Sequence, residues 1–368
     1  MSVYEEIGLK RVINASGRMT FLGVSTISDE TAEFAKQGGQ NYVVIDDLFD
    51  RAGEIVSQYT GAEDSCVTSC ASAAIVLSIA GIITKGRIDL VQRLPESDGL
   101  KNEIIIQKGH AVDYGAPMTT MIRLAGGVPK EVGYSNLVEK EHIENAINDK
   151  TAALMYVKSH HCVQKGMVSL EDMVEIAHRH NLPILVDAAA EEDLKKYVKT
   201  GADLVVYSGA KAIEATTSGF VTGKKQYISY AKKQYKGIGR AMKVGKESIM
   251  GLLKALELYT NKDEKKQVER QKSIVNYLKD EINKIDGLEC KIIKDEAGRE
   301  IYRAEVKVDE AALGMNAEHV AEELSSGNPI IYGRNHKVNL GFMSFDPRPM
   351  LEGDKEIIVK RLKEIINR

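Results

Sequence analysis

Residues 182–225 read LPILVDAAAEEDLKKYVKTGADLVVYSGAKAIEATTSGFVTGKK. Two apolar runs stand in this stretch, Ile184–Val186 and Leu204–Tyr207, with a polar segment of helical length between them. The first run ends on Asp187, and the second is followed by three small residues and Lys211. This pattern predicts two buried parallel strands, whose carboxyl ends lie at the same edge of a sheet.

A carboxylate at the end of one strand and a lysine just past the next fit one cofactor, pyridoxal phosphate (PLP). Asp187 would face a protonated pyridine nitrogen, and Lys211 would hold the cofactor as a Schiff base. Both side chains lie beyond strand carboxyl ends, where open α/β sheets bind their ligands. The alternative for Lys211 is a solvated surface lysine, which the paired carboxylate disfavours.

Strand and helix patterns alternate from about residue 62 to residue 223. The apolar runs predict four strands ahead of the central stretch, at Asp64–Thr68, Glu103–Gln107, Val128–Val132 and Thr151–Val157. Such alternation is typical of an α/β domain with a mostly parallel sheet and helices on both faces.

The chain is long enough for two domains. We expect an N-terminal arm over residues 1–20 that packs with a small domain, a large α/β domain over residues 21–245 and a small α+β domain over residues 246–368. A long helix from Glu247 towards Ile285 would link the two domains, and one short strand of the small domain is expected at Lys337–Phe342.

Composition narrows the class of protein. The net charge of the chain is −3, whereas proteins that bind nucleic acid usually carry an excess of basic residues. No nucleic-acid partner is therefore expected. The most apolar segment, Ala71–Ile83, is shorter than the roughly 20 residues that span a bilayer, and no signal-peptide pattern is visible. We therefore expect a cytoplasmic protein without a membrane partner.

The cysteines predict neither disulfides nor a metal site. Four cysteines form no CxxC pair. The triplet His160-His161-Cys162 resembles a metal-binding sequence, but adjacent side chains on a strand point to opposite faces and cannot converge on one ion. No metal is expected.

A small-residue turn follows the strand at residues 64–68 and precedes an apolar helix. Its residues are Ser69, Cys70, Ala71 and Ser72. Free N–H groups and the positive end of a helix dipole attract anions, so this turn is a candidate cradle for the PLP phosphate. A plain N-cap is the alternative interpretation.

The loop after the strand at residues 103–107 carries two flat side chains, His110 and Tyr114. Each has the shape to stack on a pyridine ring. For His110, the alternative is an ordinary polar surface group.

Several motifs, in one order along the chain, resemble a known family. They are Val12-Ile-Asn-Ala-Ser-Gly17, Val67-Thr-Ser69, Val186-Asp187, Tyr207-Ser-Gly-Ala-Lys211, Gly239-Arg-Ala-Met-Lys-Val-Gly245 and Pro329-Ile-Ile-Tyr-Gly-Arg334. The chain thus resembles the fold-type I PLP enzymes, with an aspartate aminotransferase-like fold, and within them the branch of bacterial selenocysteine synthase. That enzyme carries an extra N-terminal region for its tRNA, whereas here the expected strand at Ile13-Asn14 comes almost at once, so we do not expect a tRNA substrate.

Within that branch, three stretches are similar to the ammonia lyases that act on D-glucosaminate 6-phosphate. They are residues 109–117, residues 237–243 and Tyr332-Gly-Arg-Asn-His336 together with Asp346-Pro-Arg-Pro349. The resemblance implies loss of water and then release of ammonia from a phosphorylated amino-sugar acid. Open alternatives are a selenocysteine synthase-like transferase, a racemase or an aldolase on a small β-hydroxy amino acid, and a non-catalytic binding protein that kept the fold.

The resemblance also implies further site residues. Arg334 is the candidate for the substrate carboxylate, because a guanidinium binds it through two parallel hydrogen bonds. Arg18, Arg240 and Lys243 are candidates for phosphate. Ser208 would hydrogen-bond the PLP phosphate, and Ser218 and Gly219 would reach the cofactor of a neighbouring subunit, since relatives build their sites at a dimer interface. We therefore expect a homodimer or a multiple of dimers.

Overall fold

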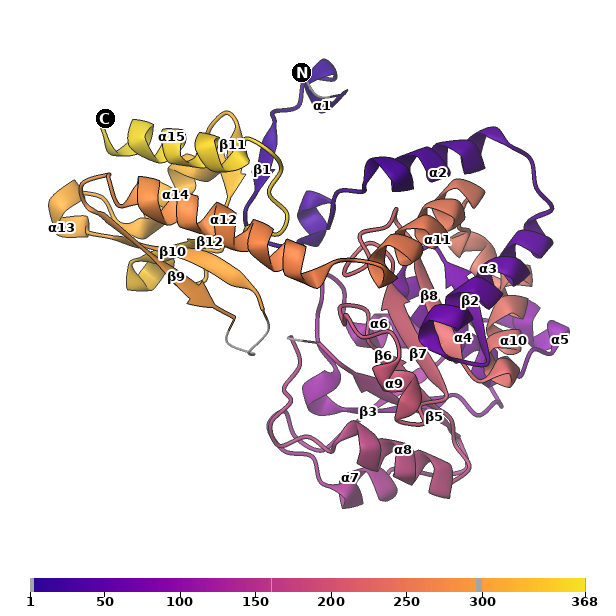
Figure 1. Ribbon diagram of the computed structural model, residues 1–368. Helices are drawn as coiled ribbons and strands as arrows, with labels where there is room; N and C mark the ends of the chain where they lie inside the picture. Colours follow the sequence, from indigo (N-terminus) through magenta and orange to yellow (C-terminus); the bar gives the residue numbers. More distant parts are fainter. Residues whose placement is uncertain (1–2, 160, 296–299, 368) are drawn as a thin grey trace. The chain divides into compact units, whose positions relative to one another are not determined.

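The computed structural model describes residues 3–159, 161–295 and 300–367 (Figure 1). It divides into two compact units, which are treated separately below. The large unit is Ile27–Asn261, and the small unit is Met1–Thr26 with Lys262–Arg368. From the sequence we expected domain boundaries after residue 20 and after residue 245. The second division lies later because helix α11 (Lys246–Thr260) packs along α2 (Asp29–Gln40) inside the large unit.

In the described residues, a seven-stranded sheet forms the centre of the large unit, with the strand order β2-β8-β7-β6-β5-β3-β4. Its strands are β2 (Asp64–Thr68), β3 (Glu103–Gln107), β4 (Val128–Val132), β5 (Thr151–Val157), β6 (Ile184–Asp187), β7 (Leu204–Ser208) and β8 (Gly219–Gly223). Neighbours from β4 to β7 pair in parallel, whereas β8 is antiparallel to both β7 and β2. The predicted, mostly parallel sheet is confirmed.

Consecutive strand residues supply two separate cores, one on each face of the sheet. Val186 and Val205 belong to one core, and their neighbours Leu185 and Val206 belong to the other. This division follows from the two-residue period of a strand and explains why the strands read as unbroken apolar runs.

Helices cover both faces of the sheet (Figure 1). The first face is covered mainly by α3 (Ile45–Thr60), α7 (Lys140–Glu144), α8 (Leu170–Arg179), α9 (Lys196–Lys199) and α11. The second is covered mainly by α4 (Ala71–Thr84), α6 (Met118–Leu124) and α10 (Lys225–Lys233). Short elements complete the unit: α5 (Ile88–Arg93), η2 (Lys108–His110), η3 (Gln234–Lys236) and η4 (Ile238–Met242).

The small unit has a core of its own between short sheets and helices. Its strands are β1 (Val12–Asn14), β9 (Leu288–Lys294), β10 (Tyr302–Val308), β11 (Ile330–Tyr332) and β12 (Phe342–Phe345). Its helical segments are α1 (Val3–Glu6), η1 (Thr20–Leu22), α12 (Glu264–Ile282), α13 (Glu310–Leu313), α14 (Ala317–Ser326), η5 (Val338–Leu340) and α15 (Asp354–Ile366). β12, β10 and β9 form an antiparallel sheet, and β1 pairs in parallel with β11, which joins the start of the chain to this unit.

Two expectations for this part of the chain were wrong. The single helix from Glu247 to Ile285 is two helices, because α11 ends at Thr260 and Asp263 caps a new helix by accepting the Lys266 N–H at 3.1 Å. A strand was expected at residues 337–342, but Val338–Leu340 form the short 3-10 helix η5. The strand β12 begins only at Phe342. Across the described residues, no helix is both long and apolar enough to span a membrane.

Candidate active site

Three strands of the large unit bring their ends together in register. Gly219, the first residue of β8, pairs with Thr68 at the end of β2 and with Ser208 at the end of β7. A β-carbon built on Gly219 would lie 2.5 Å from the amide nitrogen of Ala71 and 2.5 Å from the carbonyl carbon of Cys70. The paired residues Thr68, Gly219 and Ser208 therefore lie beside the N-terminus of α4. Two predicted site residues, Ser208 and Gly219, are thus next to the predicted turn at residues 69–72.

The start of α4 has the properties expected of an anion-binding helix end. Cys70 is its N-cap, and its Sγ accepts the Ala73 N–H at 3.4 Å. The Thr68 hydroxyl donates to the Cys70 carbonyl at 2.8 Å, which fixes the entry of the chain into the helix. The first-turn N–H groups and the helix dipole favour negative charge at this point.

Asp187 and Lys211 lie at the same edge of this sheet. Asp187 ends the buried strand β6, and Lys211 lies in the turn after β7, partly exposed. Burial raises the pKa of Asp187, while the Ala189 N–H, 3.0 Å from Oδ1, and the positive charge of Lys211 lower it. The structure thus brings together the carboxylate and the amine that the sequence paired.

Tyrosine hydroxyl groups anchor the segment that follows Asp187. Within the described chain, Tyr197 donates to the Glu191 carboxylate, Tyr207 to the Asp193 carbonyl at 2.9 Å and Tyr259 to the Glu192 carbonyl at 2.5 Å. These donors come from α9, β7 and α11. This anchoring could not be predicted from the sequence, because no local pattern links three tyrosines so far apart.

Tyr114 lies close to the start of α4. Its hydroxyl oxygen is 3.3 Å from the Ser72 Oγ. Burial raises the pKa of Tyr114, and the negative charge of Asp187 raises it further. Tyr114, Ser72 and Asp187 therefore belong to one neighbourhood of the large unit.

His110 is enclosed by protein rather than standing in an open loop. Its exposed fraction is 0%. Its Nδ1 accepts the Val157 N–H at 3.3 Å, and its ring meets the Tyr156 ring edge-on at 4.6 Å between centroids. Burial lowers the pKa of His110 to about 4, so the imidazole is neutral at physiological pH. The stacking of His110 on the cofactor stays a prediction.

Ser218 is also engaged within its own chain. Its hydroxyl donates to the Thr216 carbonyl at 2.7 Å, and its carbonyl accepts the Gly209 N–H at 2.9 Å. Ser218 and Gly219 are both buried in the large unit, and their contact with the cofactor of a neighbouring subunit stays a prediction.

The predicted cationic residues are divided between the units. Arg240 in η4 and Lys243 just after it are exposed on the large unit, whereas Arg18 and Arg334 belong to the small unit. Arg334 is half-buried, and its Nη1 donates to the Ser16 carbonyl at 3.4 Å.

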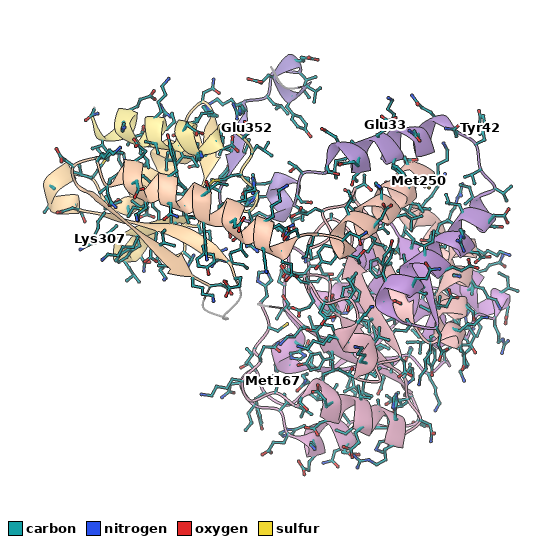
Figure 2. The ribbon with its side chains drawn as sticks, in the orientation of Figure 1. Glu33, Tyr42, Met167, Met250, Lys307 and Glu352 are labelled. Atoms are coloured by element: carbon teal, nitrogen blue, oxygen red, sulfur yellow. The ribbon has the colours of Figure 1, made fainter. Side chains whose placement is uncertain are left out.

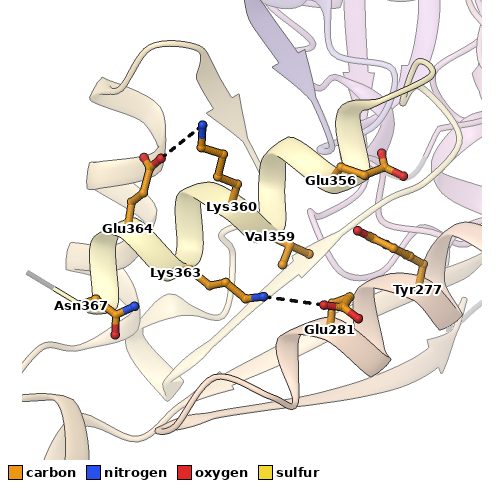
Figure 3. Close-up of a pocket in the computed structure, with 8 residues that line it drawn as sticks. All are labelled: Tyr277, Glu281, Glu356, Val359, Lys360, Lys363, Glu364 and Asn367. Carbon is orange, nitrogen blue, oxygen red and sulfur yellow. Dashed lines mark ion pairs between the residues drawn. The ribbon is translucent and has the colours of Figure 1, made fainter.

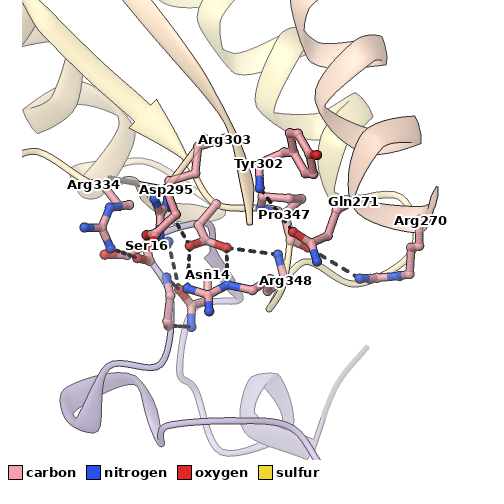
Figure 4. A network of polar contacts seen from close by, with 12 residues as sticks. Asn14, Ser16, Arg270, Gln271, Asp295, Tyr302, Arg303, Arg334, Pro347 and Arg348 are labelled. Atoms are coloured by element: carbon pink, nitrogen blue, oxygen red, sulfur yellow. Dashed lines mark hydrogen bonds and ion pairs between the residues drawn. The ribbon is translucent and has the colours of Figure 1, made fainter. Parts of the chain in front are cut away.

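Arg334 belongs to a cluster of charged side chains in the small unit (Figure 4). Its other members in the described chain are Arg303, Arg348, Asp295 and Asp346, joined by ion pairs of 2.8 to 3.1 Å. Burial lowers the pKa of Arg334, and the charge of Arg303 lowers it further. No sequence motif indicated that these residues would meet.

A surface groove of about 790 Å³ lies elsewhere on the small unit, between α12 and α15 (Figure 3). Its charged side chains pair with one another, Lys363 with Glu281 at 3.7 Å and Lys360 with Glu364 at 3.8 Å. It contains none of the predicted site residues. Among the described residues, no group of three or more His, Cys, Asp or Glu side chains could hold a metal ion, and His160 lies outside them.

Comparison with known proteins gives a consistent picture. The family model "SelA: L-seryl-tRNA selenium transferase" matches residues 12–338. A D-glucosaminate-6-phosphate ammonia lyase from Salmonella typhimurium is 49% identical over 99% of this chain and 98% of its own length. A 5'-C-glycyluridine monooxygenase-decarboxylase from Streptomyces sp. is 39% identical over 99% of this chain and 92% of its own length.

Solved structures agree with these relatives. A structure of D-glucosaminate-6-phosphate ammonia-lyase superposes with a TM-score of 0.96 at 48% identity, covering 100% of this chain and 98% of the other. An aspartate aminotransferase from Thermotoga maritima matches with a TM-score of 0.52 at 18% identity, covering 99% and 94%. The second likeness shows the fold alone, and it confirms the predicted aspartate aminotransferase-like fold.

Proposed function

This chain belongs to the SelA family, and from that premise we propose that it is a PLP-dependent ammonia lyase. Its substrate is D-glucosaminate 6-phosphate, and its products are 2-keto-3-deoxygluconate 6-phosphate and ammonia. The observation that carries the proposal is 49% identity, along almost the whole of both chains, to an enzyme of that name.

The residues at the sheet edge suit the cofactor. A buried carboxylate beside a lysine matches a group that needs one acid at its ring nitrogen and one amine at its aldehyde. Because Gly219 has no side chain, β8 packs directly against the start of α4. The backbone N–H groups at that helix end are suited to bind a phosphate. We assign Lys211 to the aldehyde and Asp187 to the ring nitrogen. Ser69, Cys70, Ala71, Ser72 and Ser208 are assigned to the phosphate.

When bound, PLP supplies a sink for the electron pair left at the carbon that carries the amino group. The Lys211 amine takes the proton from that carbon, and Asp187 holds the proton at the ring nitrogen. Departure of the neighbouring hydroxyl as water, followed by addition of water and release of ammonia, gives the keto acid. The overall change is loss of one ammonia molecule, so no oxidant or reductant is needed.

Two anions of the substrate need cationic partners. We assign the carboxylate to Arg334, because a guanidinium binds it with two parallel hydrogen bonds. Arg18, Arg240 and Lys243 are assigned to phosphate groups, and Tyr114 to the substrate. The hydrogen-bond contact between Tyr114 and Ser72 supports that last assignment, since Ser72 belongs to the rim.

We also propose a homodimer or a multiple of it. The connection between α2 and α3, with the first residue of α3, exposes a run of apolar side chains, Tyr42, Val43, Val44 and Ile45, and Figure 2 shows Tyr42 near the end of α2. A run of this kind indicates a surface that another protein covers. For location we propose the cytoplasm, because a substrate with a carboxylate and a phosphate does not cross a bilayer unaided.

A substrate panel tests the function. Purified holoenzyme is incubated with D-glucosaminate 6-phosphate, with D-glucosaminate and with L-serine, and ammonia and 2-keto acid are measured together. We expect equal amounts of the two products from the phosphorylated acid and far slower release from the others. Release from L-serine alone would favour one of the alternative enzymes on this fold. The Lys211→Ala variant is the control, and it should release neither product.

A further inference from the structure

Asp346 is the most completely buried member of the charged cluster, with an exposed fraction of 0%. Its Oδ1 accepts the Arg348 Nε–H at 2.9 Å, and its Oδ2 accepts Arg348 Nη2–H at 2.8 Å and Arg303 Nε–H at 3.1 Å. Burial alone would raise the pKa of Asp346, but the two guanidinium groups outweigh it and hold that pKa below its ordinary value. The carboxylate is therefore ionised and fully engaged.

The backbone of Asp346 also holds the turn that contacts Arg334. Its N–H donates to the Ala15 carbonyl at 2.7 Å, one residue before the Ser16 carbonyl that accepts from Arg334. The Asn14 Oδ1 accepts the N–H groups of Ser16 and Gly17 at 3.0 and 3.3 Å, which closes the turn. Figure 4 shows Asn14 and Ser16 beside the arginines.

Gly17 is the residue of the turn that lies close to both Asp346 and Arg334. Its φ of +119° lies in the region that side-chain-bearing residues rarely adopt. A β-carbon at Gly17 would lie 3.8 Å from the Asp346 Oδ2 and 3.9 Å from the Arg334 Nη1. Asp346 and Arg334 therefore lie against the same turn, although 12 positions separate them in the sequence.

The described side chains of the cluster carry more positive than negative charge. Among the described residues, three guanidinium groups face two carboxylates, and Arg334 has no carboxylate oxygen within ion-pair distance of its own guanidinium. A partly buried guanidinium without a matching carboxylate favours an external anion. In the part of the cluster that the structure describes, Arg303 and Arg348 each pair with at least one carboxylate, and Arg334 pairs with none.

We propose that Asp346 is a positioning residue, which fixes the 14–17 turn and thereby holds the Arg334 guanidinium in the orientation that receives the substrate carboxylate. This inference rests on the proposed function only for the identity of the anion. The contacts that carry it all lie within the small unit.

Two physical effects of Asp346 on anion binding have opposite signs. If the carboxylate acted only by its charge, its removal would raise the positive potential around Arg334 and tighten anion binding. If it acts by positioning, its removal frees the Arg348 side chain, whose Nη2 would lie 3.9 Å from a β-carbon at Gly17, so the turn loses that support and anion binding weakens. The Asp346→Asn variant therefore distinguishes the two effects, because Asn keeps the shape and the backbone N–H but loses the charge.

The probe is D-gluconate 6-phosphate, which has a hydroxyl group in place of the reacting amine. Its Kd for the holoenzyme is measured by calorimetry, so the result does not depend on turnover. We expect Asp346→Asn to raise this Kd about tenfold, and Arg334→Lys to raise it by a similar factor. The double variant should bind no more weakly than Arg334→Lys alone, because both changes act through one guanidinium. With substrate, KM should rise while kcat changes little.

Asp354→Asn is the matched control. Asp354 is also buried in the small unit and also pairs with an arginine, Arg11 at 2.7 Å, but its side chain binds Arg11 and the Leu351 N–H rather than the 14–17 turn. It should lower stability without changing the Kd. If Asp346→Asn does not fold, Asn14→Ala loosens the same turn without removing a buried charge, and it should raise the Kd in the same direction.

An unchanged or lower Kd in Asp346→Asn, or in Asn14→Ala where it replaces that variant, overturns the inference. The proposed function is tested separately. If the wild-type protein releases no ammonia from D-glucosaminate 6-phosphate and the Kd values still follow the expected order, the function fails and the positioning role stands.

Discussion

Gly219 lies directly against the backbone of Cys70, at the point where strand β8 passes the N-terminus of α4. A β-carbon at Gly219 would stand 2.5 Å from the Cys70 carbonyl carbon, closer than real β-carbons approach another atom. The neighbour is backbone, so it cannot rotate away. The absence of a side chain at this position sets the distance between β8 and the helix end proposed for the PLP phosphate.

Gly219→Ala should therefore weaken PLP binding and lower the free energy of unfolding by about 2 kcal/mol, because α4 must shift to admit the methyl group. Cofactor affinity is measured by titrating the apoprotein with PLP, and stability by urea unfolding. Gly39→Ala is the control, since its β-carbon would meet only the Glu247 side chain, at 3.8 Å. That change should be neutral or slightly stabilising, because Ala is the better helix former. Equal effects at the two positions would contradict the close-approach argument.

The tyrosine anchors predict a second, smaller effect. Tyr207→Phe removes the hydrogen bond to the Asp193 carbonyl but keeps the ring that stacks on Phe220. We expect a loss of about 1 kcal/mol in stability and a measurable loss of PLP affinity, because the segment after Asp187 becomes less well held. Urea unfolding and PLP titration measure the two quantities. Tyr134→Phe changes an exposed tyrosine and should alter neither quantity. If Tyr207→Phe leaves the PLP affinity unchanged, this hydrogen bond contributes to stability but not to cofactor binding.

His110 makes stability depend on pH. Its pKa is lowered to about 4 in the folded protein, while the unfolded chain titrates near the ordinary value of about 6.5. Between these values the unfolded state binds a proton that the folded state does not, so the free energy of unfolding falls as the pH falls from about 6.5 to about 4.

This contribution amounts to about 3 kcal/mol across the window. Urea unfolding of the holoenzyme at several pH values measures it, with His110→Gln as the variant that cannot titrate. The variant should be less stable at neutral pH but should lose less stability on acidification. Parallel profiles for the two proteins would show that His110 is not the group that titrates.

Much of the large unit could be read from the sequence. The bounds of β2, β3, β4 and β5 agree with the apolar runs, because strands buried on both faces need consecutive apolar residues and end at polar ones. The pairing of Asp187 with Lys211 followed from the rule that parallel strands end at one edge of a sheet.

Other features depend on contacts between distant residues. Asp346 and Arg303 meet because β12 and β10 are neighbours in the small sheet, and no local pattern encodes that pairing. The burial of His110 likewise depends on the fold, since the Val163 N–H donates to the Gly109 carbonyl and brings a later loop over it. Only the break at residues 261–263 left a local signal, an Asp in the N-cap position.

Covalent trapping identifies the lysine that holds PLP. Purified holoenzyme is reduced with sodium borohydride, digested and mapped by mass spectrometry for the peptide that carries the reduced PLP. We expect the label on Lys211, with the visible absorbance of the cofactor lost on reduction and absent from Lys211→Ala. A label on another lysine, or none after the protein has been saturated with PLP, would contradict it.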